Sequence, residues 1–408
     1  MSYAAKVRFL DRATPPHIVT LILLAGLSAL VMNIFLPSLP NMAAHFQTDY
    51  SIMQLSVAVY LGVNAVLQLV IGPISDKMGR RPVILWGIAG FCAATLGCIY
   101  APSIGWFLFF RMTQAVIVTA MVLSRAVVRD CVPQDQAASM IGYVTMGMAV
   151  VPMIGPAFGG VLDQAFGWQS NFWLLFILGV GLYWLTWSDL GETAATSGLT
   201  LGAQFKQYPE LLTSPRFWGY ALASGLASGA FFAYLGGAPF VGTEVFGMSP
   251  ATLGFFFGAP AIGYFAGNFV SGRYSARIGV NRMVYIGSLI NGTGISLSIL
   301  VFWLGLGTQW TFFGFMTFVG LGNGMIIPNA TAGMLSVRPH LAGTASGLGG
   351  AIMLGGGAAL SALAGVLLVP GSGPWPLLWI MLATALGAII AIRFVIWRAA
   401  RLAGLDSG

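Results

Sequence analysis

Charged residues are rare in this sequence. Asp, Glu, Lys and Arg make up only 7% of its 408 residues, whereas 57% are hydrophobic. Soluble domains average about 25% charged residues, so this composition excludes an ordinary soluble fold. It is the composition expected of helices that lie in lipid.

Metal-binding and nucleophilic residues are also scarce. The histidines and cysteines are His17, His45, His340, Cys92, Cys98 and Cys131. No histidine stands near another histidine or near a cysteine, so neither a zinc site nor a histidine-activated nucleophile is indicated. The cysteine spacing fits neither a disulfide framework nor a metal cluster. We therefore expect no bound metal and no cofactor.

Lysine is nearly absent as well. No lysine follows a glycine, so the Gly-Lys pair of a Walker A loop is missing and ATP hydrolysis is excluded. Glycine clusters such as residues 320–324 lie inside apolar runs, where close helix packing explains them better than a dinucleotide loop. We predict that the protein is not an enzyme, which leaves transport driven by a gradient.

Long apolar runs dominate what is present. A run of about 20 apolar residues is long enough for a helix to cross a bilayer. Twelve such spans are predicted, near residues 18–40, 51–72, 83–100, 105–127, 138–161, 169–189, 216–240, 251–272, 283–304, 309–330, 342–369 and 376–397. The first is too long for the apolar core of a signal peptide, so we expect it to stay in the protein.

A short charged turn occurs twice at the same depth. Residues 72–82 and residues 272–282 each separate two predicted spans, 200 positions apart. The matched positions are Gly72 with Gly272, Ser75 with Ser275, and Gly79 with Gly279. Such a repeat predicts a duplicated bundle, and bundles of this kind form transporters around the interface of their repeats.

The repeat also predicts where the chain divides. We expect an all-α membrane fold with two pseudo-symmetric six-helix halves, residues 1–190 and residues 216–408. The more polar stretch between them, 191–215, is predicted to be a cytoplasmic linker. It is too short to be a catalytic domain.

The positive charges give the predicted orientation. If the N-terminus is inside, every lysine and arginine outside the spans falls on the cytoplasmic side, as the positive-inside rule requires. Both termini are therefore predicted to be cytoplasmic. The net charge of +7 favours anionic membrane lipids as partners, and we expect no binding of nucleic acid.

Three motifs carry a family resemblance. The turn Gly72-Pro-Ile-Ser-Asp76-Lys-Met-Gly79-Arg80-Arg81-Pro82 resembles the loop signature of the major facilitator superfamily between its second and third helices. In the fourth span, Phe110-Arg111-Met-Thr-Gln114-Ala115 resembles the Arg-x-x-Gln motif of the drug/proton antiporters. In the fifth, Gly155-Pro156-Ala-Phe-Gly159-Gly160 resembles their antiporter motif.

Shorter stretches resemble one branch of these antiporters, the bicyclomycin/chloramphenicol resistance (Bcr/CflA) branch. They are Leu36-Pro37-Ser-Leu-Pro40, Ser124-Arg125-Ala-Val-Val-Arg129-Asp130, Ala238-Pro239-Phe240 and Glu244-Val-Phe-Gly247. The resemblance implies the twelve-helix fold of the superfamily (MFS fold), a place in the bacterial inner membrane, and multidrug efflux by proton antiport. We expect the protein to act as a monomer.

The first turn is predicted to be an inner-loop gate. Its residues are Gly72, Asp76, Gly79, Arg80, Arg81 and, below the fourth span, Asp130. The glycines permit a tight turn, Arg80 can reach Asp130, and Asp76 can lie at the positive N-terminus of the eleventh helix. These contacts would hold the two halves together when the cavity faces outward. Alternatively, the basic residues only enforce topology.

The fifth span is predicted to be a hinge. Gly155 and Gly159 stand four apart on one face, so a neighbouring helix can approach closely, and Pro156 bends the helix. Gly160 completes the motif. Ordinary small-residue packing gives almost the same physical picture, and antiport is implied only by the resemblance.

Arg111 is the most informative single residue. An arginine at this depth costs about 2.5–3.5 kcal/mol unless it faces a cavity or a partner. We expect it, with Gln114, to have a cavity or coupling role. The alternative is a structural role, in which backbone carbonyls or Gln114 bind the guanidinium.

One position departs from the pattern of the Bcr/CflA branch that the sequence resembles, because that branch usually carries an aspartate in the first span. This sequence has Asn33 there, and all eleven carboxylates are predicted to lie at span ends, in loops or in the tail. The candidates for proton coupling are Glu244, Asp163, Asp130 and Asp76. Glu244 is the first to test because it lies at the outer mouth of the seventh span.

The same distribution of charge predicts the substrate class. Because no buried carboxylate opposes Arg111, the cavity favours small neutral or anionic compounds over organic cations. We therefore expect a secondary active exporter of small amphipathic compounds. The alternatives are a dedicated metabolite exporter, an uncoupled facilitator, and a transporter-like sensor or scaffold.

Overall fold

The structure is a computed structural model that describes residues 7–131, 144, 151, 154–193, 208–338 and 342–405. Within these residues, eleven helices are long and apolar enough to cross a membrane. They are Ile18–His45, Tyr50–Gly72, Arg80–Ile99, Ile104–Val128, Gln169–Asp189, Pro215–Val245, Pro250–Ser275, Val280–Trp303, Gln309–Val337, Gly347–Leu367 and Trp375–Arg401. Eleven predicted spans are thus confirmed. The remaining one, 138–161, falls largely outside the described residues, although residues 154–166 are helical.

The helices before residue 194 form what we call the N-terminal half. They are α1 (Ile18–Asn33), η1 (Leu36–Ser38), α2 (Leu39–His45), α3 (Tyr50–Met78), α4 (Arg80–Ile99), α5 (Ile104–Gln114), η2 (Ala115–Ile117), α6 (Val118–Cys131) and α8 (Gln169–Asp189). Residues 154–166 belong to the same half.

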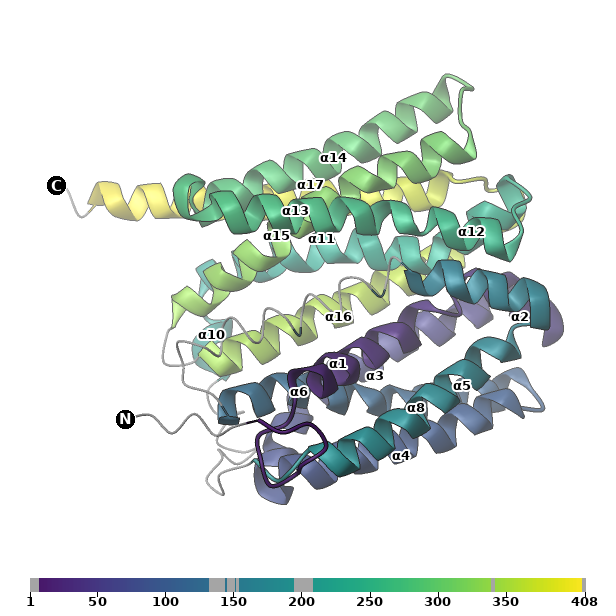
Figure 1. Cartoon of the computed structure of the whole chain (residues 1–408). Helices are drawn as coiled ribbons and strands as arrows, with labels where there is room; N and C mark the ends of the chain where they lie inside the picture. The colour runs from purple at the N-terminus through teal and green to yellow at the C-terminus, as the bar shows by residue number, and fades with distance from the viewer. Residues whose placement is uncertain are drawn as a thin grey trace.

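The helices after residue 207 form the C-terminal half. They are α10 (Tyr208–Leu212), α11 (Pro215–Phe240), η3 (Val241–Val245), α12 (Pro250–Phe256), α13 (Gly258–Ile278), α14 (Val280–Trp303), α15 (Gln309–Val337), α16 (Ala342–Leu367) and α17 (Trp375–Leu405). In Figure 1 they lie above the N-terminal helices, and α16 packs against both α11 and α3. The division at 1–190, 191–215 and 216–408 stays a prediction.

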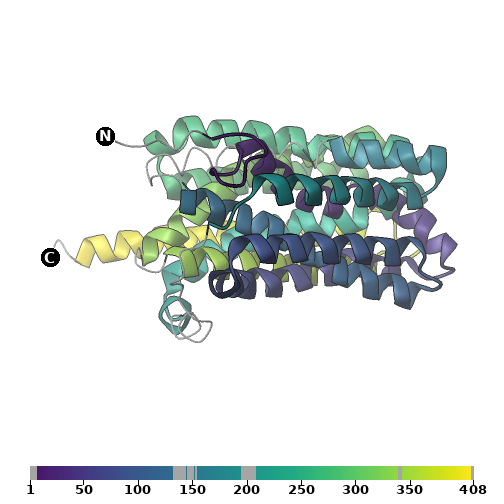
Figure 2. The ribbon, with the colours of Figure 1, turned by 60° about the horizontal axis from the view of Figure 1, so that its bottom comes forward.

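The described parts of the chain begin and end, at residues 7 and 405, at the same end of the bundle, as two views show (Figures 1 and 2). We call this the inner end, and we call the opposite end, where α2 and α12 lie, the outer end. The turn at Gly79, which joins α3 to α4, is at the inner end. The positive-inside rule predicts that the inner end faces the cytoplasm.

In two of the spans the α-helix is interrupted by a short 3-10 helix. The first span was predicted to end at residue 40, but it continues through η1 and α2 to His45. Pro37 and Pro40 stand in the first turns of these short helices, where a proline loses no helical hydrogen bond. The fourth span is interrupted by η2, directly after Gln114.

The repeated turn has the same backbone geometry in both halves. Gly79 has φ 95° and ψ 150°, and Gly279 has φ 88° and ψ 148°. Each glycine N–H donates to a serine carbonyl four residues earlier, Ser75 or Ser275, at 2.9 Å. A positive φ is accessible to glycine at little cost, which explains why glycine stands at both turns.

Cysteine labelling should establish which end is outside. In a cysteine-free background, single cysteines at Gln47 and Gly247, which follow α2 and η3 at the outer end, should react with an impermeant maleimide in intact cells. A cysteine at Lys77, which is exposed at the inner end, should react only after the cells are lysed. Labelling of Lys77→Cys in intact cells would overturn the predicted orientation.

Candidate functional site

Arg111, on α5, is fully buried, with none of its surface exposed. Its three guanidinium nitrogens all donate hydrogen bonds. Nε donates to the Ser56 carbonyl at 3.3 Å, Nη2 to the Val31 carbonyl at 3.1 Å, and Nη1 to Oε1 of Gln114 at 2.5 Å. These bonds join α5 to α1 and α3, because Val31 lies on α1 and Ser56 on α3.

Two aromatic rings cover the guanidinium. Its carbon lies 4.0 Å from the centre of the Tyr60 ring and 4.3 Å from that of Phe35. A cation attracts the negative face of an aromatic ring, and the attraction strengthens when both are removed from water. The two rings therefore complete a site that holds a positive charge without a carboxylate.

Gln114 extends this arrangement to a fourth helix. Its Nε2 donates to the Thr95 hydroxyl at 2.8 Å, and that hydroxyl donates to the Phe91 carbonyl at 2.6 Å on α4. Arg111 thus has the hydrogen-bond partners expected for a structural role, which the sequence analysis gave as the alternative to a coupling role. Its coupling role stays a prediction.

Asn33 is buried at the end of α1. Its amide donates to the Ala29 carbonyl of its own helix at 2.6 Å rather than bonding Arg111. Gly155, in the helix of residues 154–166, lies against Leu30 and Asn33. Asn33 is therefore placed at the packing surface between the first and fifth spans.

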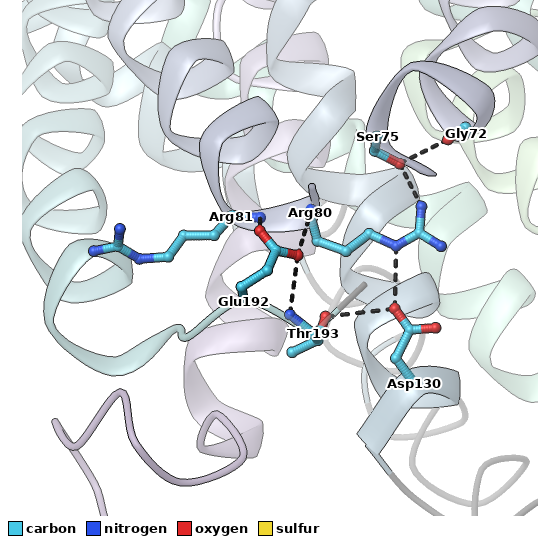
Figure 3. A network of polar contacts seen from close by, with 7 residues as sticks. All are labelled: Gly72, Ser75, Arg80, Arg81, Asp130, Glu192 and Thr193. Carbon is cyan, nitrogen blue, oxygen red and sulfur yellow. Dashed lines mark hydrogen bonds and ion pairs between the residues drawn. The ribbon is translucent and has the colours of Figure 1, made fainter. Parts of the chain in front are cut away.

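At the inner end, Arg80 forms the ion pair that the sequence suggested. Its Nε lies 3.1 Å from Oδ2 of Asp130, at the end of α6 (Figure 3). The guanidinium also donates to the Ser75 hydroxyl, which donates to the Gly72 carbonyl at 2.7 Å. The side chain of Asp76 lies outside the described residues, so its contact with the eleventh helix stays a prediction.

Glu192 belongs to the same network, and the sequence analysis missed it. Its two carboxylate oxygens accept the backbone N–H groups of Arg80 at 2.8 Å and Arg81 at 3.3 Å (Figure 3). It thereby caps α4, whose preceding residue is a glycine with no side chain to offer. A carboxylate is favoured there because the N-terminus of a helix is positive.

The segment that follows α8 is attached to the rest of this network. Arg81 donates through Nε to the Leu190 carbonyl at 2.8 Å, and the Thr193 hydroxyl contacts Asp130 at 3.4 Å. Every contact described here lies within the N-terminal half. The network therefore makes the inner ends of α3, α4, α6 and α8 one unit, and a latch between the two halves stays a prediction.

Asp189 is a second carboxylate that sequence reasoning did not single out. It is fully buried at the end of α8 and accepts from the N–H of Leu10 at 2.8 Å and of His17 at 2.9 Å. It also accepts from the Thr20 hydroxyl at 2.7 Å. The start of the first span is thus fixed to the end of the sixth.

The glycines of the fifth span face two different helices. A Cβ on Gly159 would lie 1.8 Å from the Ile34 carbonyl oxygen, beyond the end of α1. A Cβ on Gly160 would lie 2.1 Å from the Pro250 carbonyl oxygen, on α12 of the other half. Conversely, a Cβ on Gly254 would lie 2.3 Å from the Pro156 carbonyl oxygen. The halves are therefore in backbone contact here.

Two hydrogen bonds also join the halves near the outer end. The Tyr50 hydroxyl on α3 donates to the Gly236 carbonyl on α11 at 2.7 Å. Gln54 Nε2, one turn further along α3, donates to the Ser361 carbonyl on α16 at 2.8 Å. Gln54 is almost completely buried. With the glycine contacts, these bonds close the outer end between the halves.

The candidate coupling carboxylates differ in their surroundings. Glu244 is exposed on η3 at the outer end. Asp163, past the predicted span 138–161, is buried and accepts from the Asn41 amide at 3.0 Å. Burial raises the pKa of Asp163 above its ordinary value, and hydrogen bonds with Ser38 and Asn41 oppose the rise.

Replacing Asp163 by Asn should remove a contribution that lowers stability as pH rises through the acidic range. Because the pKa of Asp163 is raised in the folded protein, the folded state binds this proton more tightly than the unfolded state. Its effect therefore lowers stability as pH rises from about 4 towards the raised value. Melting temperatures across this range test it, with exposed Asp49→Asn as the control. Equal slopes in Asp163→Asn and wild type would contradict the expectation.

Comparison with known proteins shows what this chain is similar to. The chain matches the sequence profile of the Major Facilitator Superfamily over residues 21–362. It is 31% identical to the uncharacterized MFS-type transporter YdgK of Bacillus subtilis, over 84% of this chain and 87% of that protein. It is 29% identical to multidrug resistance protein D of Escherichia coli, over 91% and 93% of the two chains. It is 30% identical to a chloramphenicol resistance protein of Pseudomonas aeruginosa, over 86% and 83%.

A solved structure has the same fold. It is a bacterial homologue of the human lysosomal transporter Spinster, crystallised in an inward-facing and occupied conformation. The TM-score is 0.71 at 16% sequence identity, and the match covers 94% of this chain and 96% of that one. This likeness establishes the all-helical membrane fold.

Proposed function

Because the chain belongs to the major facilitator superfamily, a family of transporters and not of enzymes, we propose that it is a secondary active efflux transporter. It exports small amphipathic compounds, neutral or anionic, from the cytoplasm across the bacterial inner membrane as a monomer. We assign it to the bicyclomycin/chloramphenicol resistance branch, which the names of its multidrug and chloramphenicol resistance relatives support.

The observation that carries this proposal is the closed outer end. Gln54 and Tyr50 bond across the halves, and Gly160 and Gly254 bring the halves into backbone contact. Such contacts form when a central site is shut off from the outside and must break when it opens there. Any alternating-access transporter needs such contacts while its site is open to the inside, and the resistance relatives support export as the direction of transport.

The charge around Arg111 supports the substrate class. Among the described residues no carboxylate pairs with its guanidinium, which is held by carbonyls, an amide and two rings. The positive charge is therefore offset only by dipoles and ring faces and is not neutralised by a carboxylate, which disfavours organic cations in this low-dielectric region. Neutral compounds such as chloramphenicol meet no such penalty.

Proton antiport requires a carboxylate that can change its charge during the cycle. Asp163 and Glu244 both lie at the outer end, where a proton would enter. Asp163 combines burial with a raised pKa, so it holds a proton more readily than an exposed carboxylate does. We propose Asp163 and Glu244 as the two coupling candidates, to be separated by Asp163→Asn and Glu244→Gln.

Accumulation of two compounds in cells tests the function. Cells that express the protein should retain less chloramphenicol, which is neutral, than cells with an empty vector. Retention of ethidium, a cation, should change little. A Gly160→Val variant, which cannot close the outer end, serves as the inactive control. Equal chloramphenicol retention in all three strains would contradict efflux, and strong ethidium export would contradict the charge argument.

A further inference from the structure

The inner end of the C-terminal half carries a large excess of positive charge. Its described arginines are Arg216, Arg273, Arg277, Arg282, Arg338, Arg393, Arg398 and Arg401. Among the described residues of this half, the only carboxylate at that end is Glu210, which pairs with Arg338 at 3.0 Å. The N-terminal half instead has Asp130, Asp189 and Glu192 at its inner end. The two halves therefore differ in how many carboxylates offset the basic residues at their inner ends.

The difference between the halves can be located at the repeated turn. After Gly79, the carboxylate of Glu192 occupies the N-terminus of α4, so close that a Cβ on Gly79 would lie 2.4 Å from its oxygen. At Gly279, which has the same backbone geometry, no side chain or backbone atom from elsewhere in the described part of the chain lies within 4 Å of a Cβ position. Gly279, which precedes α14, has no side chain with which to cap this helix. In the N-terminal half this turn thus accommodates a carboxylate, whereas no other described residue occupies the matching place in the C-terminal half.

A cavity of about 370 Å³ lies at this open turn. Its lining includes Arg216, Tyr220, Gly279, Asn281, Arg282 and Ser336. The Tyr220 hydroxyl donates to Oδ1 of Asn281 at 2.6 Å, and Arg216 donates to the Ser336 hydroxyl at 3.5 Å. Two arginines and the start of a helix therefore line one space that has room for a phosphate group.

The cavity also lies at the level of lipid headgroups. Its walls come from the first residues of α11 and α14 and the last residues of α15, where these spans begin and end. Arginine binds phosphate through paired hydrogen bonds, and helix N-termini bind phosphate through their free N–H groups. We propose that this cavity binds the phosphate of an anionic phospholipid headgroup. The bound lipid supplies the negative charge that Glu192 supplies in the other half.

Lipid binding to the purified, full-length protein tests the site. Native mass spectrometry in detergent can count phosphatidylglycerol and phosphatidylcholine retained by each variant. Arg282→Gln should weaken phosphatidylglycerol binding about five-fold, the effect of one arginine near a headgroup. Asn281→Asp should weaken it at least as much, because it adds a negative charge while keeping the acceptor for Tyr220. Arg273→Gln is the matched control, since Arg273 lies at the same end but does not line the cavity.

Three outcomes would overturn the proposal. If Arg273→Gln weakens binding as much as Arg282→Gln does, the lipid responds to the overall charge of this end and not to the cavity. If phosphatidylcholine is retained as well as phosphatidylglycerol, no anion is selected. If inorganic phosphate competes at the same concentration as phosphatidylglycerol, the occupant is a free anion. Because the readout is binding, the result does not depend on whether the protein exports drugs.

Discussion

Arg111→Lys is expected to destabilise the protein more than Arg111→Met does, although lysine keeps the charge. The guanidinium makes three hydrogen bonds to Val31, Ser56 and Gln114. A lysine ammonium cannot reproduce this planar fork, and losing two bonds to a buried charge costs about 3 kcal/mol. Methionine fills similar space and leaves no unsatisfied charge in the bilayer. Thermal unfolding of the purified variants in detergent measures the difference.

Transport by the same two variants separates the roles proposed for Arg111. If the guanidinium only joins α1, α3 and α5, a folded Arg111→Met variant should still export chloramphenicol at a measurable rate. If the positive charge also takes part in coupling, that variant should be stable but inactive. Arg111→Lys with wild-type stability would contradict the structural account, because an ammonium would then satisfy a site built for a guanidinium.

Gly160→Ala is the second substitution with a large expected effect. Its methyl group would lie 2.1 Å from the Pro250 carbonyl oxygen, so the fifth span and α12 must separate. Overpacking of this kind costs about 1–3 kcal/mol, and here the cost falls on the state with a closed outer end. We expect the outer end to open more often and export to fall. Gly254→Ala should act in the same direction, because it meets Pro156 from the other side.

A buried cysteine reports this opening. Ser361→Cys replaces a fully buried side chain and keeps the carbonyl that accepts from Gln54. In a cysteine-free background, its reaction with an impermeant maleimide should become about tenfold faster in Gly160→Ala, since 1.4 kcal/mol corresponds to a factor of ten. Gly155→Ala is the matched control on the same helix, where the nearest atom is a flexible Leu30 methyl group at 3.2 Å. Equal rates in the two variants would show that the Gly160 contact does not close the outer end.

The spans could be predicted from the sequence because lipid imposes a simple requirement of length and apolarity. The turn at Gly79 was also predictable, since its positive φ calls for glycine and its repeat at Gly279 marked a duplicated bundle. The extension of the first span to His45 was not. Pro37 and Pro40 lie near the predicted end, and each stands in the first turn of a short helix, where a proline lets the chain continue.

The partners of Arg111 illustrate what the sequence leaves undetermined. The free-energy cost of burying its charge indicated that the guanidinium must have a partner. The partners include the backbone carbonyls of Val31 and Ser56, and a backbone carbonyl cannot be recognised as a partner from the sequence. Asp189 and Glu192 were missed for a related reason. Glu192 lies 112 residues from the Arg80 N–H that it caps, and which carboxylate meets that helix depends on how α8 packs against α4. The available clue was that α4 begins after a glycine, without a capping side chain of its own.

Proton movement in proteoliposomes tests the central claim most directly. Purified protein is reconstituted with a pH-sensitive dye inside the vesicles, and chloramphenicol is added without an imposed pH gradient. A coupled exporter must move protons when substrate moves, so we predict a substrate-stimulated pH change that is lost in Gly160→Val vesicles. Movement of chloramphenicol without any pH change would identify an uncoupled facilitator, and absence of both would contradict the account of this protein as a transporter of such compounds.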